Sequence, residues 1–135
     1  MRVWEGQSRG QLKRTITGNG SFRSLGWSRD GRTIIGVEGK ATEPANPGAV
    51  RLWEEANGTL IQTMEGSAQV ACLSPDANEV VGIEGNDTIV FWDARTGKVK
   101  RRLKASAMNE VVFSPDGSIL VGVSNDGSTK LWRLR

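Results

Sequence analysis

Serine side chains recur at three equivalent positions and are the first candidates for nucleophilic chemistry. Ser28, Ser74 and Ser114 each precede an aspartate by two positions, in Ser-Arg-Asp-Gly, Ser-Pro-Asp-Ala and Ser-Pro-Asp-Gly. A catalytic triad needs an imidazole base, and the sequence has no histidine, which excludes such triads and imidazole metal ligands. A catalytic serine would be singular, whereas repetition in every unit is typical of turns. We therefore predict turn serines and a protein that is not an enzyme.

Acidic residues also recur. Glu38 and Glu84 follow equivalent short apolar runs, and Ser124 replaces them in a third copy. Carboxylates placed in this way could gather near one face of an assembled ring and attract a cation or a basic partner. Charges at strand ends are more often solvated, and we adopt that interpretation. The sequence predicts no metal site and no cofactor.

Basic residues cluster in one segment, which contains Lys98, Lys100, Arg101, Arg102 and Lys104. Such a strip could bind a phosphate backbone or an acidic partner. Lysine and arginine on an exposed edge strand also prevent aggregation between edges, which is the simpler interpretation. No aromatic residue interleaves the strip to stack on bases, and the net charge is only +3, so we do not expect nucleic-acid binding.

Length and composition limit the remaining classes. The 135 residues suffice for one domain, and the one cysteine, Cys72, excludes an internal disulfide and any Cys-Cys zinc site. Cys72 lies in an apolar run and is expected to be a small core residue. No apolar run approaches the roughly 18 residues of a membrane helix. We expect no membrane association and a cytoplasmic location.

The elements that position these residues follow a repeat. Trp53 and Trp92 are 39 positions apart, and Trp92 and Trp132 are 40 apart. Each tryptophan ends an apolar run that follows two tight turns, so each unit reads as short strands joined by turns. A period of this length indicates a repeat architecture.

This spacing, with a third strand that ends in an apolar residue and tryptophan, resembles the WD-repeat family of β-propellers from Val3 to Trp132. The resemblance implies an all-β chain of four-stranded antiparallel blades. Family members often lock each blade with an Asp-His-Ser/Thr-Trp network. Here the structural repeat positions are Trp53, Trp92 and Trp132, with Asp126 in the last turn and Asn86 in the middle one, and the histidine is absent.

Glycine recurs in the middle of each second strand, at Gly36, Gly82 and Gly122. Glycine in mid-strand weakens a strand, so its recurrence indicates close approach of a large ring or a neighbouring backbone. We expect that ring to be the tryptophan of the same repeat.

The expected strands fall into four successive groups of two, four, four and three strands. Residues 1–18 form strands of a split blade, 19–65 form blade one with an insertion loop at 39–49, 66–104 form blade two, and 105–135 form blade three without its outer strand. The strand around Trp4 is one more than three blades need.

Three blades cannot close a ring, because propellers typically have about four to eight. Two chains would supply six blades and three chains would supply nine. We therefore expect a homodimer, with a trimer as the alternative, in which the strand containing Gly10, Leu12 and Ile16 completes the last blade of another copy. The chain could also be a piece of a longer repeat array, and both could be true together.

The resemblance implies a scaffold that binds a protein or peptide, because the fold hosts many activities and does not identify one. A ligand- or glycan-binding propeller and a structural fragment without a ligand are the alternatives, although few aromatic residues remain outside the repeat positions. We place the partner site at the polar residues that open the inner strands and in the insertion loop, namely Arg23, Gln69, Asn109, Glu43, Pro44, Asn46 and Pro47.

Overall fold

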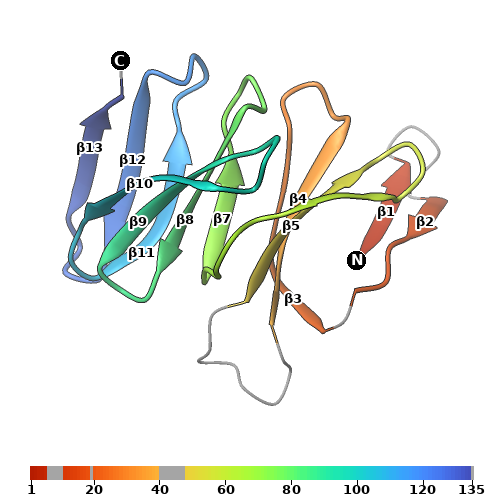
Figure 1. The fold of residues 1–135 in the computed structure, drawn as a ribbon, viewed down its shortest axis with the longest axis horizontal. Coiled ribbons are helices and arrows are strands. Elements are labelled where there is room, and N and C mark those ends of the chain that lie inside the picture. Colours follow the sequence, from red (N-terminus) through yellow and green to blue (C-terminus); the bar gives the residue numbers. More distant parts are fainter. Residues whose placement is uncertain (6–10, 19, 40–47, 135) are drawn as a thin grey trace.

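The computed structural model describes residues 1–5, 11–18, 20–39 and 48–134. Over these residues the chain forms thirteen strands, shown in Figure 1. Their bounds are β1 Arg2–Glu5, β2 Gln11–Thr15, β3 Ser21–Trp27, β4 Thr33–Gly39, β5 Ala49–Glu54, β6 Leu60–Thr63, β7 Val70–Leu73, β8 Glu79–Glu84, β9 Thr88–Asp93, β10 Val99–Lys104, β11 Met108–Phe113, β12 Ile119–Ser124 and β13 Thr129–Arg133.

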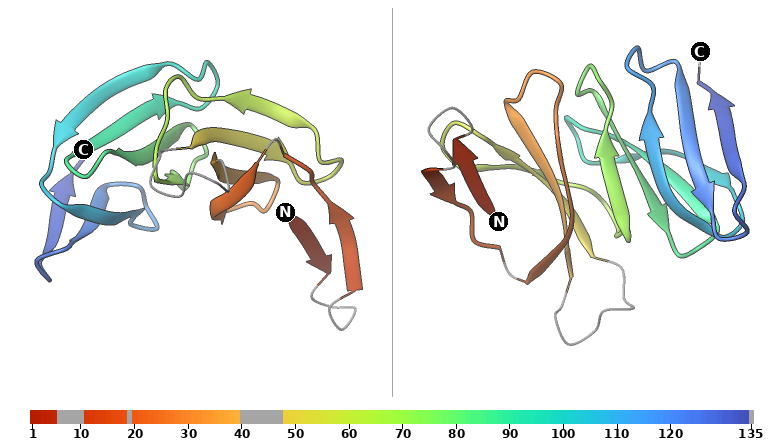
Figure 2. Two further views of the ribbon diagram at one scale, coloured as in Figure 1. Left: turned by 90° about the horizontal axis from the view of Figure 1, so that it is seen from below. Right: turned by 180° about the vertical axis from the view of Figure 1, so that it is seen from behind.

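The strands form four antiparallel sheets, in the orders β1-β2, β3-β4-β5-β6, β7-β8-β9-β10 and β11-β12-β13. Neighbours in each sheet are neighbours in sequence, as in a meander. The sheets follow one another around an open arc with the innermost strands on its concave side (Figure 2). The predicted all-β fold of propeller-like blades is confirmed.

Each first strand is joined to the second by the same hydrogen-bonded turn. Ser28 Oγ donates to Asp30 Oδ1 at 2.6 Å, and the backbone N–H of Thr33 donates to Ser28 Oγ at 2.9 Å. The turns at Ser74 and Ser114 repeat both bonds, at 2.6 and 3.0 Å and at 2.7 and 3.0 Å. The serines are therefore turn residues, as predicted, and their hydroxyl groups complete an Asx-type turn.

The mid-strand glycines lie under the repeat tryptophans, as expected. A Cβ added at Gly36 would lie 2.8 Å from the Trp53 ring, one at Gly82 would lie 3.0 Å from Trp92, and one at Gly122 would lie 2.9 Å from Trp132. Any larger residue would displace the ring or the strand, so glycine is required by the close approach.

The cores lie between successive sheets. One cluster joins the faces of β4 and β5 to β7, β8 and β9, with Val37, Leu52, Val80 and Trp92 at its centre. A second joins β8 and β9 to β11 and β12. The second four-stranded sheet thus buries one face against the sheet before it and the other against the sheet after it, which is the packing of successive repeats.

The first two strands pack on the first four-stranded sheet. Ile16 and Val3 are both buried against Ile34 and Trp53. β1 is therefore not redundant, contrary to the expectation from the strand count, because it contributes Val3 to a core. Within one chain β2 pairs with β1, with Leu12 opposite Trp4, and Gly10 lies outside the described residues.

Candidate functional site

The insertion loop emerges beside the inner strand of the second four-stranded sheet. Gly48 and Ala68 form an isolated antiparallel bridge, with N–H···O distances of 2.8 and 2.9 Å. The bridge fixes the end of the loop one residue before Gln69. Four predicted partner residues, Glu43, Pro44, Asn46 and Pro47, lie outside the described residues.

The other three predicted partner residues come from three different sheets. Arg23 lies at the start of the loop, since a Cβ added at Gly39 would lie 2.5 Å from its guanidinium carbon. Gln69 is half-buried, and its backbone N–H donates to the Ile83 carbonyl at 2.9 Å. Asn109 is exposed on β11. The structure therefore brings Arg23 and Gln69 to the two ends of the loop and leaves Asn109 on the three-stranded sheet.

A buried ion pair lies below the loop. Glu38 is 5% exposed and pairs with Arg51 Nη1 on the adjacent strand β5. The solvated interpretation of Glu38 was therefore wrong, because the carboxylate is enclosed and needs a cation beside it. Glu84 is half-buried and pairs with Arg102 at 3.2 Å. The sequence around each glutamate could not reveal its arginine partner, because Arg51 and Arg102 lie on other strands.

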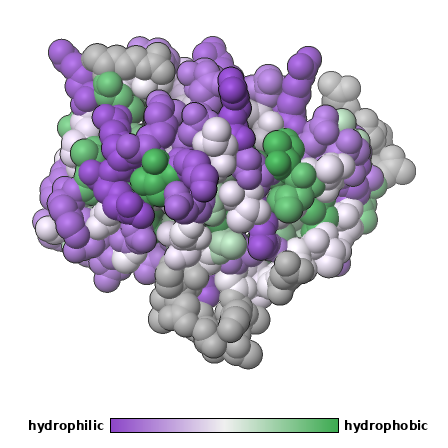
Figure 3. Space-filling view, viewed as in Figure 1, coloured by the Kyte–Doolittle hydropathy of each residue, from purple (hydrophilic) through white to green (hydrophobic). Residues whose placement is uncertain are grey.

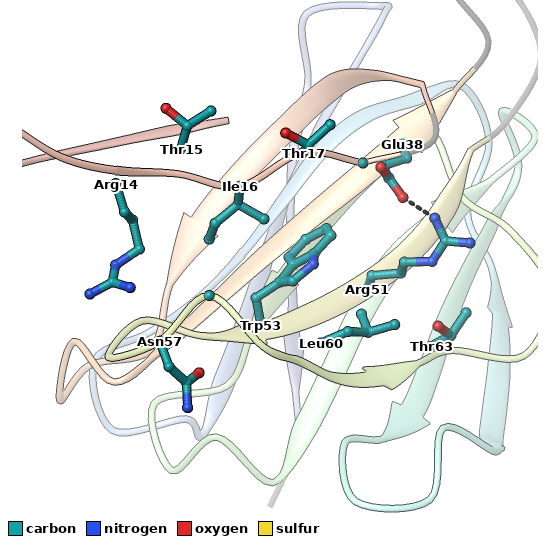
Figure 4. Close-up of a pocket in the computed structure, with 12 residues that line it drawn as sticks. Arg14, Thr15, Ile16, Thr17, Glu38, Arg51, Trp53, Asn57, Leu60 and Thr63 are labelled. Carbon is teal, nitrogen blue, oxygen red and sulfur yellow. Dashed lines mark hydrogen bonds and ion pairs between the residues drawn. The ribbon is translucent and has the colours of Figure 1, made fainter.

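A cavity of about 380 Å³ lies between β2 and the first four-stranded sheet (Figure 4). Arg14 and Thr17 line it from β2 and the residues after it, Arg51 and Trp53 line it from β5, and Leu60 lines it from β6. The Nε atom of Arg14 is buried and has no hydrogen-bond partner among the described residues. Sequence reasoning did not identify this cavity, since it forms between strands of two sheets.

The opposite face is formed by the serine turns. Arg29 Nη1 donates to the Pro115 carbonyl at 3.3 Å, which links the first turn to the third. Hydrogen bonds from Ser114 and Ser118 lower the pKa of Asp116 to about 2. A bond from Ser28 likewise lowers the pKa of Asp30. These carboxylates are ionised at neutral pH, and each is an acceptor within its own turn.

Cys72 and Trp27 line a second cavity, of about 370 Å³, beside these turns. Cys72 Sγ lies 3.5 Å from the Val111 carbonyl, and burial raises the pKa of the thiol to about 12. A thiol with so high a pKa is unreactive at neutral pH. Trp27 is 54% exposed, as is Trp4, so these two aromatic side chains are accessible on the surface.

The basic strip on β10 is matched by acidic side chains. Lys100 lies 3.3 Å from Glu79 and Lys104 lies 3.4 Å from Asp87. Arg101 lies over the Phe91 ring at 4.2 Å. Figure 3, in the view that has β10 in front, shows hydrophilic side chains of this kind over most of the face. These contacts favour the interpretation as a solvated outer strand.

The remaining repeat residues are buried or hydrogen-bonded within the fold. Trp92 is buried and its Nε1 donates to the Glu65 carbonyl at 2.7 Å. Trp132 is half-buried. Asp126 accepts from the Ser128 N–H at 2.8 Å, which closes its turn, and the Asn86 carbonyl accepts from the Met108 N–H at 2.9 Å.

The described residues offer neither a metal-binding cluster nor a membrane-spanning helix. No group of three or more His, Cys, Asp and Glu side chains in this part of the chain could hold a metal ion. Among the same residues no helix has the length and apolar character to cross a bilayer.

Comparisons with known proteins give the same repeat. Residues 97–133 match the family described as WD domain, G-beta repeat. The chain is 26% identical over 91 residues to Protein LST8 homolog of Drosophila melanogaster, and 27% identical over 92 residues to the protein of the same name from Drosophila pseudoobscura pseudoobscura. Each match covers 63% of this chain and 29% of the relative. The matched region thus corresponds to less than a third of the length of these relatives.

Proposed function

We propose that this chain, a member of the WD-repeat family, is a non-catalytic interaction module that binds a protein or peptide on the face of its insertion loop. The bridge between Gly48 and Ala68 supports this site most directly, because it fixes the end of the loop beside an inner strand. A loop anchored at its base and flanked by Arg23 and Gln69 offers backbone and polar groups on a rigid frame. Binding residues are often presented in this way.

The interior of the fold favours a scaffold over an enzyme. Its recurrent hydroxyl groups are engaged in turns, as the 2.6 Å bond from Ser74 Oγ to Asp76 Oδ1 illustrates. Two carboxylates at equivalent repeat positions, Glu38 and Glu84, are each paired with an arginine. Groups held in this way by structural partners are not poised for proton transfer or attack.

A loop replacement tests the site. Residues 39–48 are replaced by Asn-Asp-Gly, the short connection that the last unit has at 125–127. Peptides selected from a random display library on the wild-type protein are then measured against this variant by biolayer interferometry. We expect loss of binding to the variant and unchanged binding to a Ser118→Ala control, which alters the opposite face.

Peptides that bind the loop variant as tightly as the wild type would refute the loop-face site. The variant must first show the circular dichroism spectrum and cooperative melting of the wild type. Long loops can be shortened at small entropic cost when the flanking strands keep their register, so a folded variant is expected.

We also propose that copies of the chain assemble through the faces at the two ends of the arc. At one end, Leu25 and Trp27 are both 54% exposed, whereas their repeat equivalents Ala71 and Leu73 are buried against the preceding sheet. At the other end, Leu131 is 64% exposed on β13. Apolar faces of this kind are typical of surfaces that another element covers.

The residues of the two faces occupy repeat positions that contact each other between successive sheets within the chain. Leu131 is equivalent to Phe91, which is fully buried where the second four-stranded sheet meets the three-stranded sheet. It is also equivalent to Val3, which covers Ile34 and Trp53 at the amino-terminal end. The last sheet of one copy can therefore cover the first sheet of the next with the contacts that the repeat already uses. Such contacts are heterologous, and a closed particle results only if the rotation closes.

A further inference from the structure

The molecule contains two equivalent clefts between outer strands, and the second is bridged by side-chain hydrogen bonds. The first cleft lies between β2 and β5–β6, and the second lies between β6 and β9–β10. Gly58 packs on Ile16 and Arg14 in the first, and Gly97 packs on Thr63 and Gln62 in the second. These contacts identify the two clefts as repeats of one geometry.

The second cleft is closed by hydrogen bonds from the chain itself. Gln62 Nε2 donates to the Arg95 carbonyl at 2.8 Å, and Glu65 Oε2 accepts from the Val99 N–H at 3.3 Å. The Glu65 carbonyl also accepts from Trp92 Nε1. Side chains of the protein therefore fill the space and satisfy its polar groups.

The first cleft contains the cavity of about 380 Å³ shown in Figure 4. Its volume falls within the range of small-molecule sites, roughly 300 to 1,000 Å³. The apolar wall is formed by Trp53, Ile16 and Leu60, and Arg14 lines the cavity beside them. In Figure 4, Arg14 and Ile16 point to one side of the strand, whereas Thr15 and Thr17 point to the other. The cavity therefore offers a guanidinium donor beside an apolar surface.

Most of the charge substitutions between the two clefts make the first cleft more positive. Arg14 stands where the second cleft has Gln62, Arg51 stands in place of Val90, and Thr17 stands in place of Glu65, whereas Thr63 stands in place of Arg102. Three of these changes each make the cleft one unit more positive and the fourth makes it one unit less positive, so the net gain is two units of positive charge. Glu38 is acidic like its equivalent Glu84 and pairs with Arg51. The cleft is therefore positive relative to its repeat.

Arg14 supplies the direct indication of a missing anionic partner. Its Nε is enclosed and has no partner among the described residues. A buried guanidinium donor without an acceptor is costly, and a bound anion would satisfy it. The neighbouring cation, Lys13, already pairs with Glu55 at 2.6 Å and does not line the cavity.

From these features we infer that the cleft between β2 and the first four-stranded sheet binds a small molecule bearing a phosphate group. The guanidinium of Arg14 contacts the phosphate oxygens. An apolar body attached to the phosphate rests against Leu60 and Trp53. A phosphate is favoured over a carboxylate, because a phosphate monoester carries roughly −1.5 to −2 units of charge at neutral pH and the cleft is two units more positive than its repeat.

Binding is tested with phenyl phosphate and inorganic phosphate as probes and succinate as the comparison anion, at constant ionic strength. Amide chemical shifts of residues 14–18 and the Trp53 indole signal are followed in two-dimensional NMR spectra. Both phosphates should shift these signals, and phenyl phosphate should bind more tightly because its ring adds apolar contact. Arg14→Gln, which installs the residue of the filled cleft, should weaken binding about tenfold or more.

Lys13→Gln is the matched control, since it removes the same charge from the adjacent residue and should leave binding unchanged. The site is refuted if neither phosphate shifts the signals, or if Arg14→Gln binds as the wild type does. Equal weakening in both variants would indicate a nonspecific charge effect and also overturn the inference. Tighter binding of succinate than of inorganic phosphate would refute the phosphate class.

Discussion

At the scale of single residues, each blade depends on the contact between one tryptophan ring and one glycine. The ring of Trp92 is 1% exposed and lies on Gly82, while the equivalent ring of Trp132 is half-buried on Gly122. The difference arises because Trp92 lies between two complete sheets and Trp132 lies in the three-stranded sheet. The same residue type thus contributes unequally at equivalent positions.

Trp92→Ala should therefore reduce the free energy of unfolding by about 3 to 5 kcal/mol, the range for truncating a buried aromatic side chain. Trp132→Ala should cost clearly less, because part of its ring is already in water. Urea denaturation of both variants measures the difference. A loss below about 1 kcal/mol for Trp92→Ala would contradict its place in the core.

Ala77, like Ala107, is an alanine with a positive φ. Its φ is +60°, where the equivalent turns have Gly31 at +73° and Gly117 at +75°. A residue with a Cβ is disfavoured in this region by roughly 1 to 2 kcal/mol, and glycine costs roughly 0.5 to 1 kcal/mol of entropy. The alanine is thus the only departure from glycine among these three turns.

Ala77→Gly should accordingly raise the free energy of unfolding by about 0.5 to 1 kcal/mol, the difference between those two terms. Gly31→Ala is the reverse change at an open site, with no atom within 4 Å of an added Cβ, and should destabilise by a similar amount. Thermal unfolding of the two variants gives both values. Shifts of the same sign would contradict the argument.

The sequence allowed the turn serines and the glycine–tryptophan contacts to be predicted, because both are local and recur in every unit. The pairing of Glu38 with Arg51 was not predictable in the same way. It depends on which strands become neighbours, and position 51 corresponds to valine in the next unit. The cavity at Arg14 has the same origin, since it arises where two sheets meet.

At the scale of elements, the serine turn is a charged structure whose stability depends on pH. The pKa of Asp116 falls from 3.8 to about 2 on folding, since Ser114 and Ser118 donate hydrogen bonds to the carboxylate. The native state therefore binds fewer protons than the unfolded chain between these values. The contribution of Asp116 is present above about pH 4 and is lost as the pH falls toward 2.

The difference in unfolding free energy between the wild type and Asp116→Asn should consequently shrink as the pH is lowered from 5 to 2. An asparagine amide can accept the N–H bond but has no charge to lose. Urea denaturation at several pH values measures this difference. Parallel curves for the two proteins would show that the turn carboxylate is not linked to folding.

The strands themselves were predictable from alternating apolar runs and turn residues, and the pattern of two, four, four and three strands agrees with the sheets. The role of β1 was not predictable from the count. Val3 is buried because it takes the place of a third strand against Ile34 and Trp53. Only packing between sheets distinguishes such a strand from a surplus one.

At the scale of the whole molecule, the proposed ring would make β1 compete with β13 of another copy for one position. Both are third strands of a blade, and Val3 of β1 is equivalent to Leu131 of β13. β2 pairs with β1 within the chain. If β13 of another copy replaced β1 at the edge of β2, the last sheet of that copy would cover Leu25 and Trp27, which β1 and β2 leave exposed. Ring closure therefore requires β1 to separate from β2.

This competition predicts opposite effects of two truncations. Deleting residues 1–5 removes β1, so the edge of β2 becomes available, the cover of Ile34 is lost and self-association should increase. Deleting residues 1–18 also removes β2 and should weaken association. Leu131→Glu should weaken it as well, with little effect on the fold of the single chain, because this side chain is 64% exposed.

Light scattering at micromolar concentration gives the mass of each form. A mass of two chains corresponds to six blades, within the usual range of propellers, and a mass of three chains to nine. A wild-type protein and a 1–5 deletion that both remain monomeric would refute closure by self-association, and a deletion of residues 1–5 that lowers the mass would refute the rivalry of β1 and β13.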